Sequence, residues 1–477
     1  MRRPYKALAR IHPALGAHYK VKKVIMMIKL TKDRSFYKTL FAVALPAAFQ
    51  ALIAQLVNLS DTILVGRLPG FAMAGVGQTN EISNIFFMAT LGLISGASVL
   101  ISQYWGKRDL DRIKQIFSLV LTVTIGLSVT VAILVRIFPR QILTLFNSDM
   151  AVVEAAIPYI IIFCFSFIPY AIAQSLIGML RAIEVTKVAL VMSIVTLFVD
   201  VSLNIILIFG FLGFPAMGVR GAALGTLIAR WVEVAIVGAY VFKVQKVIPM
   251  RLTDLKPAEG WLWRDYRKYG LPVALGDTQW ALVGLGKSFI LGQLGGLMIS
   301  ANIIAANMLS LGMLFCFALA NGATVVIGKS VGEGNYDKTR EYSTSIQWMF
   351  LVFGIFFASI VFMSRSWFAG LYGTSQDIAN LAIAMIGLGA PTMVGTCYHA
   401  ACFVGINRGA GDGKFVMYVD IICGWLVVLP ISALAAFVWK VPLAWMFLFL
   451  RIDQCFKWII AFIRLRGNKW IKNVTRA

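Results

Sequence analysis

One stretch that decides the fold occurs twice, as Leu56-Val-Asn-Leu-Ser-Asp-Thr-Ile-Leu-Val-Gly-Arg-Leu-Pro-Gly70 and as Leu282-Val-Gly-Leu-Gly-Lys-Ser-Phe-Ile-Leu-Gly-Gln-Leu-Gly-Gly296. The copies are 226 residues apart, and the same spacing relates Gly96-Ala-Ser-Val-Leu-Ile101 to Gly322-Ala-Thr-Val-Val-Ile327. Such a long register is not expected by chance, so the sequence predicts two homologous halves.

The composition places both halves in a membrane. Of the 477 residues 59% are hydrophobic and only 14% are charged, and the mean hydropathy is +0.81. A soluble chain could not bury so much apolar surface. Stretches of about 20 or more apolar residues predict twelve spans, at 38–66, 74–103, 115–138, 152–180, 186–210, 219–243, 266–293, 297–328, 343–364, 379–406, 413–437 and 440–463. Kinks are expected at Pro46, Pro169, Pro272 and Pro391, because several spans exceed the required length.

The basic residues indicate the orientation of the chain. The net charge is +23, which also occurs in nucleic-acid-binding proteins, but its distribution argues against that partner. With the N-terminus inside, 34 of the 44 Lys and Arg residues lie in the tails and even-numbered connections, and 6 lie in the odd-numbered ones. This is the positive-inside pattern. We therefore expect a multi-pass protein of the cell membrane, with both termini cytoplasmic and the excess charge facing anionic lipids.

The expected architecture is all-α: twelve transmembrane helices in two six-helix bundles. Six is an even number, so both bundles start on the same side and the repeat is parallel, as in alternating-access carriers. The predicted boundaries are a basic cytoplasmic extension (1–35), a first lobe (36–244), a cytoplasmic linker (245–264), a second lobe (265–464) and a basic tail (465–477). The extension lacks the apolar core of a cleaved signal peptide. We expect a monomer.

Motifs of enzymes and metal proteins are missing from the sequence. It contains no phosphate-binding loop and no nucleophile elbow, and the six cysteines all fall in spans without metal-ligand spacing. A transporter without a cofactor is therefore favoured over an enzyme. A channel is disfavoured by the repeat and by the lack of a filter segment.

Acidic residues inside spans mark the candidate functional site, since a carboxylate there costs roughly 2.5–3.5 kcal/mol. Asp61 and Asp200 lie deepest in apolar sequence. Asn204 follows Asp200 by one helical turn, and Thr226 adds a hydroxyl from the next span. Two carboxylates with amide and hydroxyl oxygens suit a proton or a hard cation, so Asp61 and Asp200 would be the ligands of Na⁺ in a sodium-coupled protein.

Other charged residues in spans have competing interpretations. The repeat places Lys287 at the position of Asp61; it either neutralises a carboxylate across the cavity or snorkels to the membrane surface. Arg230 and Glu233 are spaced to form an ion pair. Glu81 lies near the outer start of its span and is expected to be a solvated residue at the mouth.

Several motifs together resemble the multidrug and toxic compound extrusion (MATE) family. They are Ala44-Leu-Pro46 with Asp61-Thr-Ile-Leu-Val-Gly66, Gly96-Ala-Ser98 with Tyr104-Trp-Gly-Lys-Arg-Asp109, Leu203-Asn-Ile-Ile-Leu-Ile-Phe-Gly210 with Gly218-Val-Arg-Gly-Ala-Ala-Leu-Gly-Thr226, and Arg408-Gly-Ala-Gly-Asp-Gly-Lys414. The resemblance runs from about residue 36 to the C-terminus. It implies a V-shaped transporter that expels cationic amphipathic compounds in exchange for inward Na⁺ or H⁺.

The resemblance also assigns site residues. It places a cation-coupling site at Asp61, Asp200, Asn204 and Thr226, although many relatives have Asn first and Asp one turn later. Because this order is reversed here, the choice between Na⁺ and H⁺ stays open. Asp277 falls where relatives often have a Glu, and Trp280 could stack on a cation. Asp277 and Asp420 therefore either line the substrate cavity, with Trp280 and Lys287, or are ordinary helix acids.

The predicted function is multidrug efflux, with small organic cations as substrates and a coupling ion that neutralises Asp61 and Asp200. The alternative is a flippase of lipid-linked oligosaccharides or other lipids from the same exporter superfamily. Such proteins tend to have more spans and a cationic cavity for phosphate.

Overall fold

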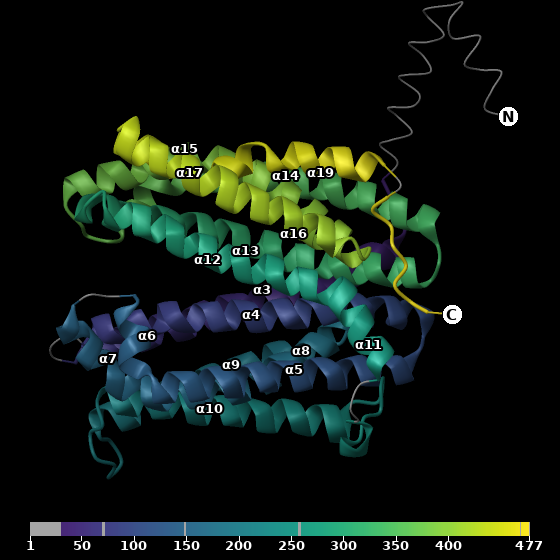
Figure 1. Ribbon diagram of the computed structural model, residues 1–477, viewed down its shortest axis with the longest axis horizontal. Helices are drawn as coiled ribbons and strands as arrows, with labels where there is room; N and C mark the ends of the chain where they lie inside the picture. The colour runs from purple at the N-terminus through teal and green to yellow at the C-terminus, as the bar shows by residue number, and fades with distance from the viewer. Residues whose placement is uncertain (1–29, 69–71, 147–148, 256–258, 468, 477) are drawn as a thin grey trace, which may run out of the picture.

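The computed structural model describes residues 30–68, 72–146, 149–255, 259–467 and 469–476, which contain helices and turns but no β-strand. Two layers of long, roughly parallel helices make up the molecule (Figure 1). Helices α4 to α10 lie in the lower layer and α12 to α19 in the upper layer, with α3 at the boundary between them. The all-α architecture predicted from the sequence is confirmed. Most of the predicted basic extension, residues 1–29, lies outside the described residues.

The first half of the chain contains long helices joined by short turns. Its helices are α3 (Arg34–Val65), α4 (Ala72–Lys107), α5 (Leu110–Ile137), α6 (Pro139–Thr144), α7 (Met150–Phe163), the 3₁₀ turn η1 (Cys164–Ser166), α8 (Phe167–Ala182), α9 (Lys187–Phe209), α10 (Val219–Ala239) and the π turn η2 (Tyr240–Val244). The connection to the second half holds the 3₁₀ turn η3 (Leu252–Asp254), α11 (Gly260–Asp265) and the π turn η4 (Tyr266–Gly270).

The second half repeats this pattern with more π-helical turns. Its elements are α12 (Leu271–Gly292), α13 (Gly296–Gly332), α14 (Tyr336–Gly370), α15 (Gln376–Ala400), η5 (Ala401–Arg408), α16 (Gly413–Ile421), η6 (Ile422–Val428), α17 (Leu429–Ala433), η7 (Leu434–Val438), α18 (Leu443–Phe449), η8 (Ile452–Cys455) and α19 (Lys457–Arg466). Segments η5, η6 and η7 are π turns, which are often found at functional sites.

The spacing of the sequence repeat reappears in the helix boundaries. Helices α5, α7 and α9 begin at Leu110, Met150 and Lys187. Helices α14, α15 and α16 begin 226 residues later in each case, at Tyr336, Gln376 and Gly413. The two halves therefore share not only sequence but also the places where their helices start.

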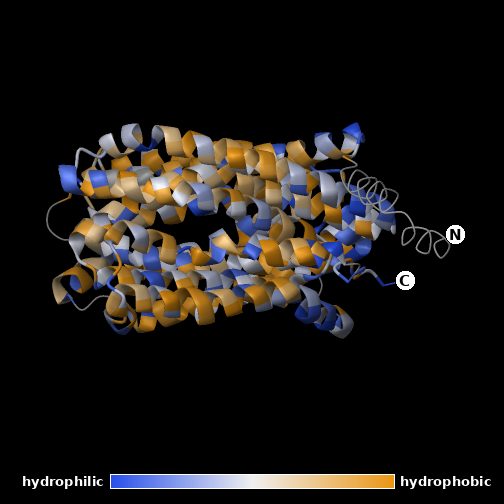
Figure 2. Cartoon of the chain, turned by 90° about the horizontal axis from the view of Figure 1, so that it is seen from above, coloured by the Kyte–Doolittle hydropathy of each residue, from blue (hydrophilic) through white to orange (hydrophobic). Residues whose placement is uncertain are grey.

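Ten described segments are long and apolar enough to cross a membrane. The predicted seventh and twelfth spans are not among them, and they correspond to α12 and to the run α18–η8–α19. Asp277 and Lys287 lower the hydropathy of α12, and the last span is broken into pieces of at most 10 residues. With these two included, the helices form the predicted twelve-span fold. Apolar residues dominate the middle of the helices in Figure 2.

Two of the predicted kink sites coincide with irregular turns. Pro169 follows the 3₁₀ turn η1, and Pro272 opens α12 directly after the π turn η4. Pro46 and Pro391 lie inside the continuous helices α3 and α15.

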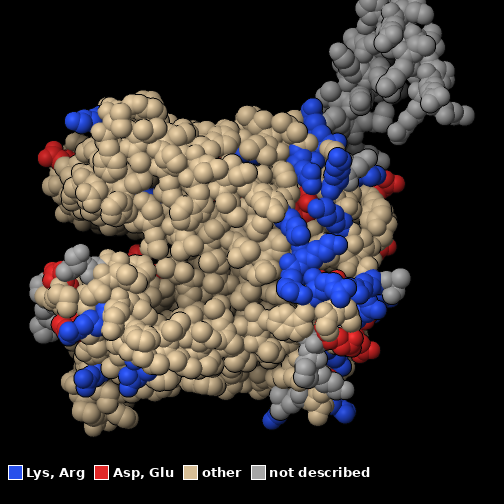
Figure 3. Space-filling view, viewed as in Figure 1, with Lys and Arg blue, Asp and Glu red and all other residues tan. Residues whose placement is uncertain are grey.

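Figure 3 shows that the two ends of the molecule differ. Lys and Arg side chains gather at one end, which we call the basic end; it contains Lys107, Lys329, Arg464, Lys472 and Arg476. At the opposite end, the open end, the surface is hollowed by a cleft between the two layers.

At the basic end, α4 and α13 touch through glycines. A Cβ added to Gly106 would lie 2.1 Å from the Lys329 carbonyl oxygen, and one added to Gly332 would lie 1.9 Å from that of Gln103. Lys329 also pairs with Glu184 at 2.7 Å, which joins α13 to the α8–α9 connection. Backbone contact of this kind is possible only with glycine, so the lobes are closed against each other here.

The C-terminal segment 469–476 crosses the basic end and contacts both halves (Figure 1). Buried Gln103 on α4 accepts a hydrogen bond from the Val474 amide at 2.8 Å and donates to the carbonyl groups of Lys472 and Gly409. The Lys472 side chain pairs with Asp412 at 2.5 Å. We call residues 469–476 the tail segment.

Candidate functional site

A buried polar site lies in the first lobe, where α3, α9 and α10 meet. The Nδ2 group of Asn204 donates to Asp61 Oδ1 at 2.7 Å and to Asp200 Oδ2 at 3.3 Å. Asp61 is on α3, whereas Asp200 and Asn204 lie one turn apart on α9. One amide therefore bridges the two carboxylates, as the one-turn spacing of Asp200 and Asn204 allows.

Three of the four site residues are shielded from solvent, and Asp61 is half-buried. Asn204 is fully buried, Asp200 is 1% exposed and Thr226 is 7% exposed. The Thr226 hydroxyl on α10 interacts with the Asp200 carboxyl. The four residues expected from the sequence are thus brought together in space, and the reversed order of Asp200 and Asn204 does not separate them.

Charge in this site is not balanced by an ion pair. Among the described residues, Asp61 and Asp200 form no salt bridge with Lys or Arg. The guanidinium of Arg230 lies in their electrostatic neighbourhood, one turn after Thr226, but it pairs with Glu233 at 2.8 Å. The predicted Arg230–Glu233 pair is therefore confirmed, and among the described residues the two aspartates have no basic partner of their own.

The oxygen groups of this site suit a proton or a hard cation. Asn204 Oδ1 is buried without a hydrogen-bond partner in the described structure, and it lies against Gly225 on α10. A Cβ added to Gly225 would be 2.2 Å from that oxygen, so the glycine is needed to admit the amide. Among the described residues, no set of three or more His, Cys, Asp or Glu side chains forms a metal centre, so the site offers two carboxylates with neutral oxygens.

The acids of the second lobe have basic partners. Asp277 on α12 accepts two hydrogen bonds from Arg408, at 2.7 and 3.2 Å. Arg408 is the last residue of the π turn η5 and is only 6% exposed. A bidentate pair of this geometry neutralises Asp277.

Asp420 belongs to a second neutralised cluster. Lys457 on α19 lies 3.0 Å from Asp420 and 2.8 Å from Asp453, and its side chain is 3% exposed. Gln454 donates to Asp453 at 2.9 Å and accepts from Thr396 at 2.9 Å. This network joins α15, α16 and the broken last span, and its charged groups are buried together.

Lys287 lies near this cluster without joining it. Its side chain is half-buried, and the described residues offer it no hydrogen bond or ion pair. The charged groups that act on it electrostatically are Asp453, Arg451 and Lys457, and two of the three carry the same sign as Lys287. The structure thus places Lys287 away from Asp61, its counterpart in the repeat.

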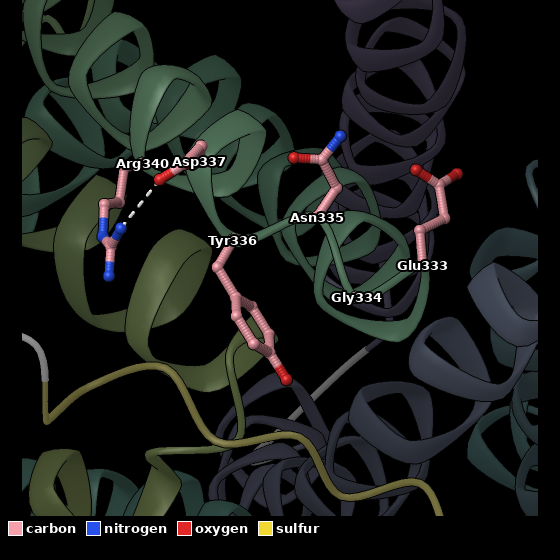
Figure 4. Close-up of a pocket in the computed structure, with 6 residues that line it drawn as sticks. All are labelled: Glu333, Gly334, Asn335, Tyr336, Asp337 and Arg340. Atoms are coloured by element: carbon pink, nitrogen blue, oxygen red, sulfur yellow. Dashed lines mark hydrogen bonds and ion pairs between the residues drawn. The ribbon is translucent and has the colours of Figure 1, made fainter.

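Trp280 is 54% exposed and lines a pocket of about 210 Å³ between α4 and α12, together with Glu81. A larger hollow of about 420 Å³ lies over the α13–α14 turn, from Glu333 to Arg340. Figure 4 shows its side chains spread apart rather than converging, with Arg340 paired to Asp337. Asn335 there caps α14 by accepting from the Lys338 amide, so the hollow is a helix connection.

Sequence reasoning missed three basic side chains that decide the charge of these sites. Arg408 appeared only as part of a motif, Lys457 only as a basic residue within a span, and Arg230 only as the partner of Glu233. A hint was present, since basic residues inside spans commonly pair with acids. Asp277 lies 131 residues from Arg408 and Asp420 lies 37 residues from Lys457, so spacing could not identify these two pairs. The pair of Lys457 with Asp453 has i,i+4 spacing and could have been expected from the sequence.

Comparisons with known proteins agree with this architecture. The sequence model of the MatE family matches the chain twice, at residues 46–206 and 275–434. The chain is 26% identical over 392 residues to the probable multidrug resistance protein NorM of Streptococcus pneumoniae serotype 4, covering 81% of this chain and 86% of that protein. It is 23% identical over 450 residues to the uncharacterized transporter YisQ of Bacillus subtilis, covering 93% and 97%.

Solved structures of the same fold are also similar. The eukaryotic MATE transporter AtDTX14 superposes with a TM-score of 0.81 at 19% identity, covering 92% of this chain and 97% of that one. A MATE protein in the bent conformation superposes with a TM-score of 0.82 at 19% identity, covering 93% and 96%. The two matches of the family model, one in each six-helix half, show that this chain belongs to the MatE family, the multidrug and toxic compound extrusion family of membrane transporters.

Proposed function

We propose that this chain is a secondary active efflux transporter that exchanges cationic organic compounds for inward Na⁺ or H⁺ by alternating access. The observation that carries the proposal is the bridge from Asn204 to Asp61 and Asp200. Relatives named as multidrug resistance proteins support the substrate class.

The bridge supports ion coupling because a buried and a half-buried carboxylate, side by side in an apolar bundle, are costly when both are ionised. Binding of a proton or of Na⁺ would remove that cost, so the stability of the site depends on whether the coupling ion is present. The site also joins α3 to α9, and α3 packs against α13 of the other lobe. Binding of the coupling ion at this site would therefore alter the packing of α3 against α13, and with it the contact between the lobes.

The sidedness follows from the positive-inside rule. The basic end would face the cytoplasm, and the cleft at the open end would face outward. The conformation described here then corresponds to the outward-facing state, in which external cations reach Asp61 and drug leaves. Inward movement of one charge releases about 2.3 kcal/mol per 100 mV of membrane potential, which would drive export.

The test is ethidium transport by the full chain in proteoliposomes, with a Na⁺ gradient alone and then a pH gradient alone. We expect one gradient to drive transport and Asp61→Asn to abolish it. Asp337→Asn is the matched control, because Asp337 is an exposed aspartate far from the site. Transport by Asp61→Asn at the wild-type rate, or no response of wild type to either gradient, would overturn the proposal.

A lipid flippase would need basic groups to hold phosphate. The pocket beside Trp280 is lined by one acid and no base. Arg408 and Lys457 are already paired with Asp277 and Asp420, so they are not free to bind a phosphate group. Movement of a fluorescent anionic lipid across the same vesicles, without ethidium transport, would favour the flippase.

A further inference from the structure

Helices α4 and α12, one from each lobe, are in backbone contact toward the basic end. A Cβ added to Gly96 would lie 2.3 Å from the Gly270 carbonyl oxygen, and one added to Gly92 would lie 2.9 Å from the Ala274 Cα. Gly270 is the last residue of η4, directly before α12, so four residues forward on α4 correspond to four residues back from Ala274 on α12 to Gly270. Moving toward the open end, the next facing residues are Met88 and then Asn84 on α4, opposite the turn of α12 that carries Trp280.

Beyond this contact the two helices enclose a pocket of about 210 Å³. Its walls are one face of each helix, with residues spaced three or four apart; they are Glu81, Asn84, Ile85 and Met88 on α4, and Trp280, Ala281, Gly284, Leu285 and Ser288 on α12. A Cβ added to Gly284 would meet no atom within 4 Å, so the space beside it is open.

Glu81 gives this pocket its charge. It is the one charged residue in the lining, its side chain is exposed, and no hydrogen bond or ion pair involves it in the described part of the chain. Asp277 lies at the α4–α12 contact next to the pocket, because a Cβ added to Gly92 would be 3.1 Å from the Asp277 Cβ. Arg408 neutralises this carboxylate. The uncompensated negative charge between the lobes is therefore at Glu81.

Trp280 supplies the complementary surface. Its indole is 54% exposed, and Trp is the side chain that attracts a cation most strongly over its ring face. Met88 and Leu285 add apolar contacts that adapt to differently shaped groups. A carboxylate, an aromatic face and a flexible apolar wall together select an organic cation over an anion.

The volume limits what the pocket can hold. Drug-sized ligands occupy pockets of roughly 300–1,000 Å³, which is more than the 210 Å³ between α4 and α12. The pocket therefore fits the charged end of a substrate, and the remainder of a larger molecule would extend into the cleft at the open end.

We propose that the α4–α12 pocket binds the positively charged group of an organic cation, with Glu81 as its counter-charge and Trp280 as its stacking surface. The inference rests on the proposed export of organic cations and adds the residues that recognise them. It assigns this role to Glu81 rather than to Asp277 or Asp420, which are held in ion pairs.

The experiment measures binding of ethidium to the detergent-purified full chain by fluorescence anisotropy. Three variants remove different properties of the pocket: Glu81→Gln removes charge, Trp280→Leu removes the ring, and Gly284→Leu fills the space without touching backbone. We expect each to raise the Kd about tenfold, the effect of losing roughly 1.4 kcal/mol. Wild type should bind ethidium more tightly than a neutral phenanthridine of similar shape. Glu81→Gln should bind the two compounds with similar Kd values.

Matched controls make the same changes elsewhere. Glu333→Gln changes an exposed glutamate, Trp348→Leu a 41% exposed tryptophan on α14, and Gly126→Leu a glycine on α5 with no atom within 4 Å of an added Cβ. These should bind ethidium as wild type does. If wild type binds ethidium and all three pocket variants keep its Kd within twofold, the proposed binding pocket is wrong, whereas the proposed efflux function is unaffected. If wild type neither binds nor exports ethidium, the proposed function fails and the pocket with it.

Discussion

Arg476 donates two hydrogen bonds of 2.7 Å to the two carboxylate oxygens of Asp265. Asp265 ends α11 in the connection between the lobes, whereas Arg476 lies in the tail segment that follows the second lobe. Because the same segment bonds to Gln103 of the first lobe, the tail segment links both lobes at the basic end. In the proposed alternating-access cycle, the tail segment would have to be released before the basic end could open.

The first prediction concerns Gln103, which is fully buried and serves three backbone groups of the opposite half. Gln103→Leu should lower the free energy of unfolding by about 1–3 kcal/mol, because buried backbone groups lose their partners. SDS titration in mixed micelles measures this. Gln293→Leu, at an exposed position after α12, should have no effect. Equal stability of wild type and Gln103→Leu would show that the tail segment is only loosely attached.

The second prediction tests the geometry of the Asn204 bridge. Gly225→Ala should reduce ion-driven transport as severely as Asn204→Ala, because the new methyl group would displace the amide that lies 2.2 Å away. Gly238→Ala, on the same helix, meets no atom within 4 Å and should transport normally. Initial rates in proteoliposomes, normalised to the amount of protein, provide the comparison. Full activity of Gly225→Ala would argue against a fixed amide position.

The third prediction concerns the Asp277–Arg408 pair. Asp277→Asn should cost about 3 kcal/mol of stability, since it leaves a buried guanidinium without its counter-charge. Arg408→Gln should cost less, because the Asp277 side chain retains 26% exposure and stays partly hydrated. The double variant should recover part of the loss, which a double-mutant cycle would reveal. Additive losses would mean that the pair contributes no coupling.

The fourth prediction separates Lys457 from Lys287. Lys457→Met leaves Asp420 and Asp453 without their shared cation and should destabilise the second lobe by about 3–5 kcal/mol. Lys287→Met should be neutral or slightly stabilising, because two of the three charged groups around Lys287 are also positive. Unfolding and ethidium export are both measured. Loss of export in Lys287→Met would instead favour a transport-linked ion pair for this lysine.

The fifth prediction is a pH dependence at the basic end. The Tyr342 hydroxyl donates to Asp33 at 2.5 Å and, with the Ser35 amide and Lys338, lowers the pKa of this carboxyl. The resulting stability is present above the unfolded pKa of about 3.9 and is lost as the pH falls through the lower folded value. The difference in Tm between wild type and Asp33→Asn should therefore be constant from pH 7 to 5 and shrink below pH 4. A difference that grows on acidification would contradict this assignment.

Much of the fold was predictable because it depends on local properties of the chain. Apolar length and the 226-residue repeat predicted the number of spans and the shared helix starts. The last span was harder: its apolar length is sufficient, but Asp453 and Gln454 fall in a 3₁₀ turn that breaks the helix. Their hydrogen bonds with Thr396 and Lys457 stabilise that break, and they depend on packing against other helices.

The sequence by itself determined that the chain spans a membrane, that it consists of two similar halves, and that Asp61 and Asp200 are costly residues in apolar helices. The sequence also indicated the local Arg230–Glu233 pair, but only the tertiary structure decided which basic residues compensate Asp277 and Asp420. The sequence left open whether Asp277 and Asp420 line the substrate cavity or are ordinary helix acids, and in the structure Arg408 and Lys457 neutralise them from other helices. The physical reason is that the cost of a carboxylate in an apolar helix can be recognised from its neighbours in the sequence. An ion pair instead requires two side chains within 4 Å of each other, and these can come from distant parts of the chain. Among the described residues, lobe packing therefore leaves Asp61, Asp200 and Glu81 without a basic partner.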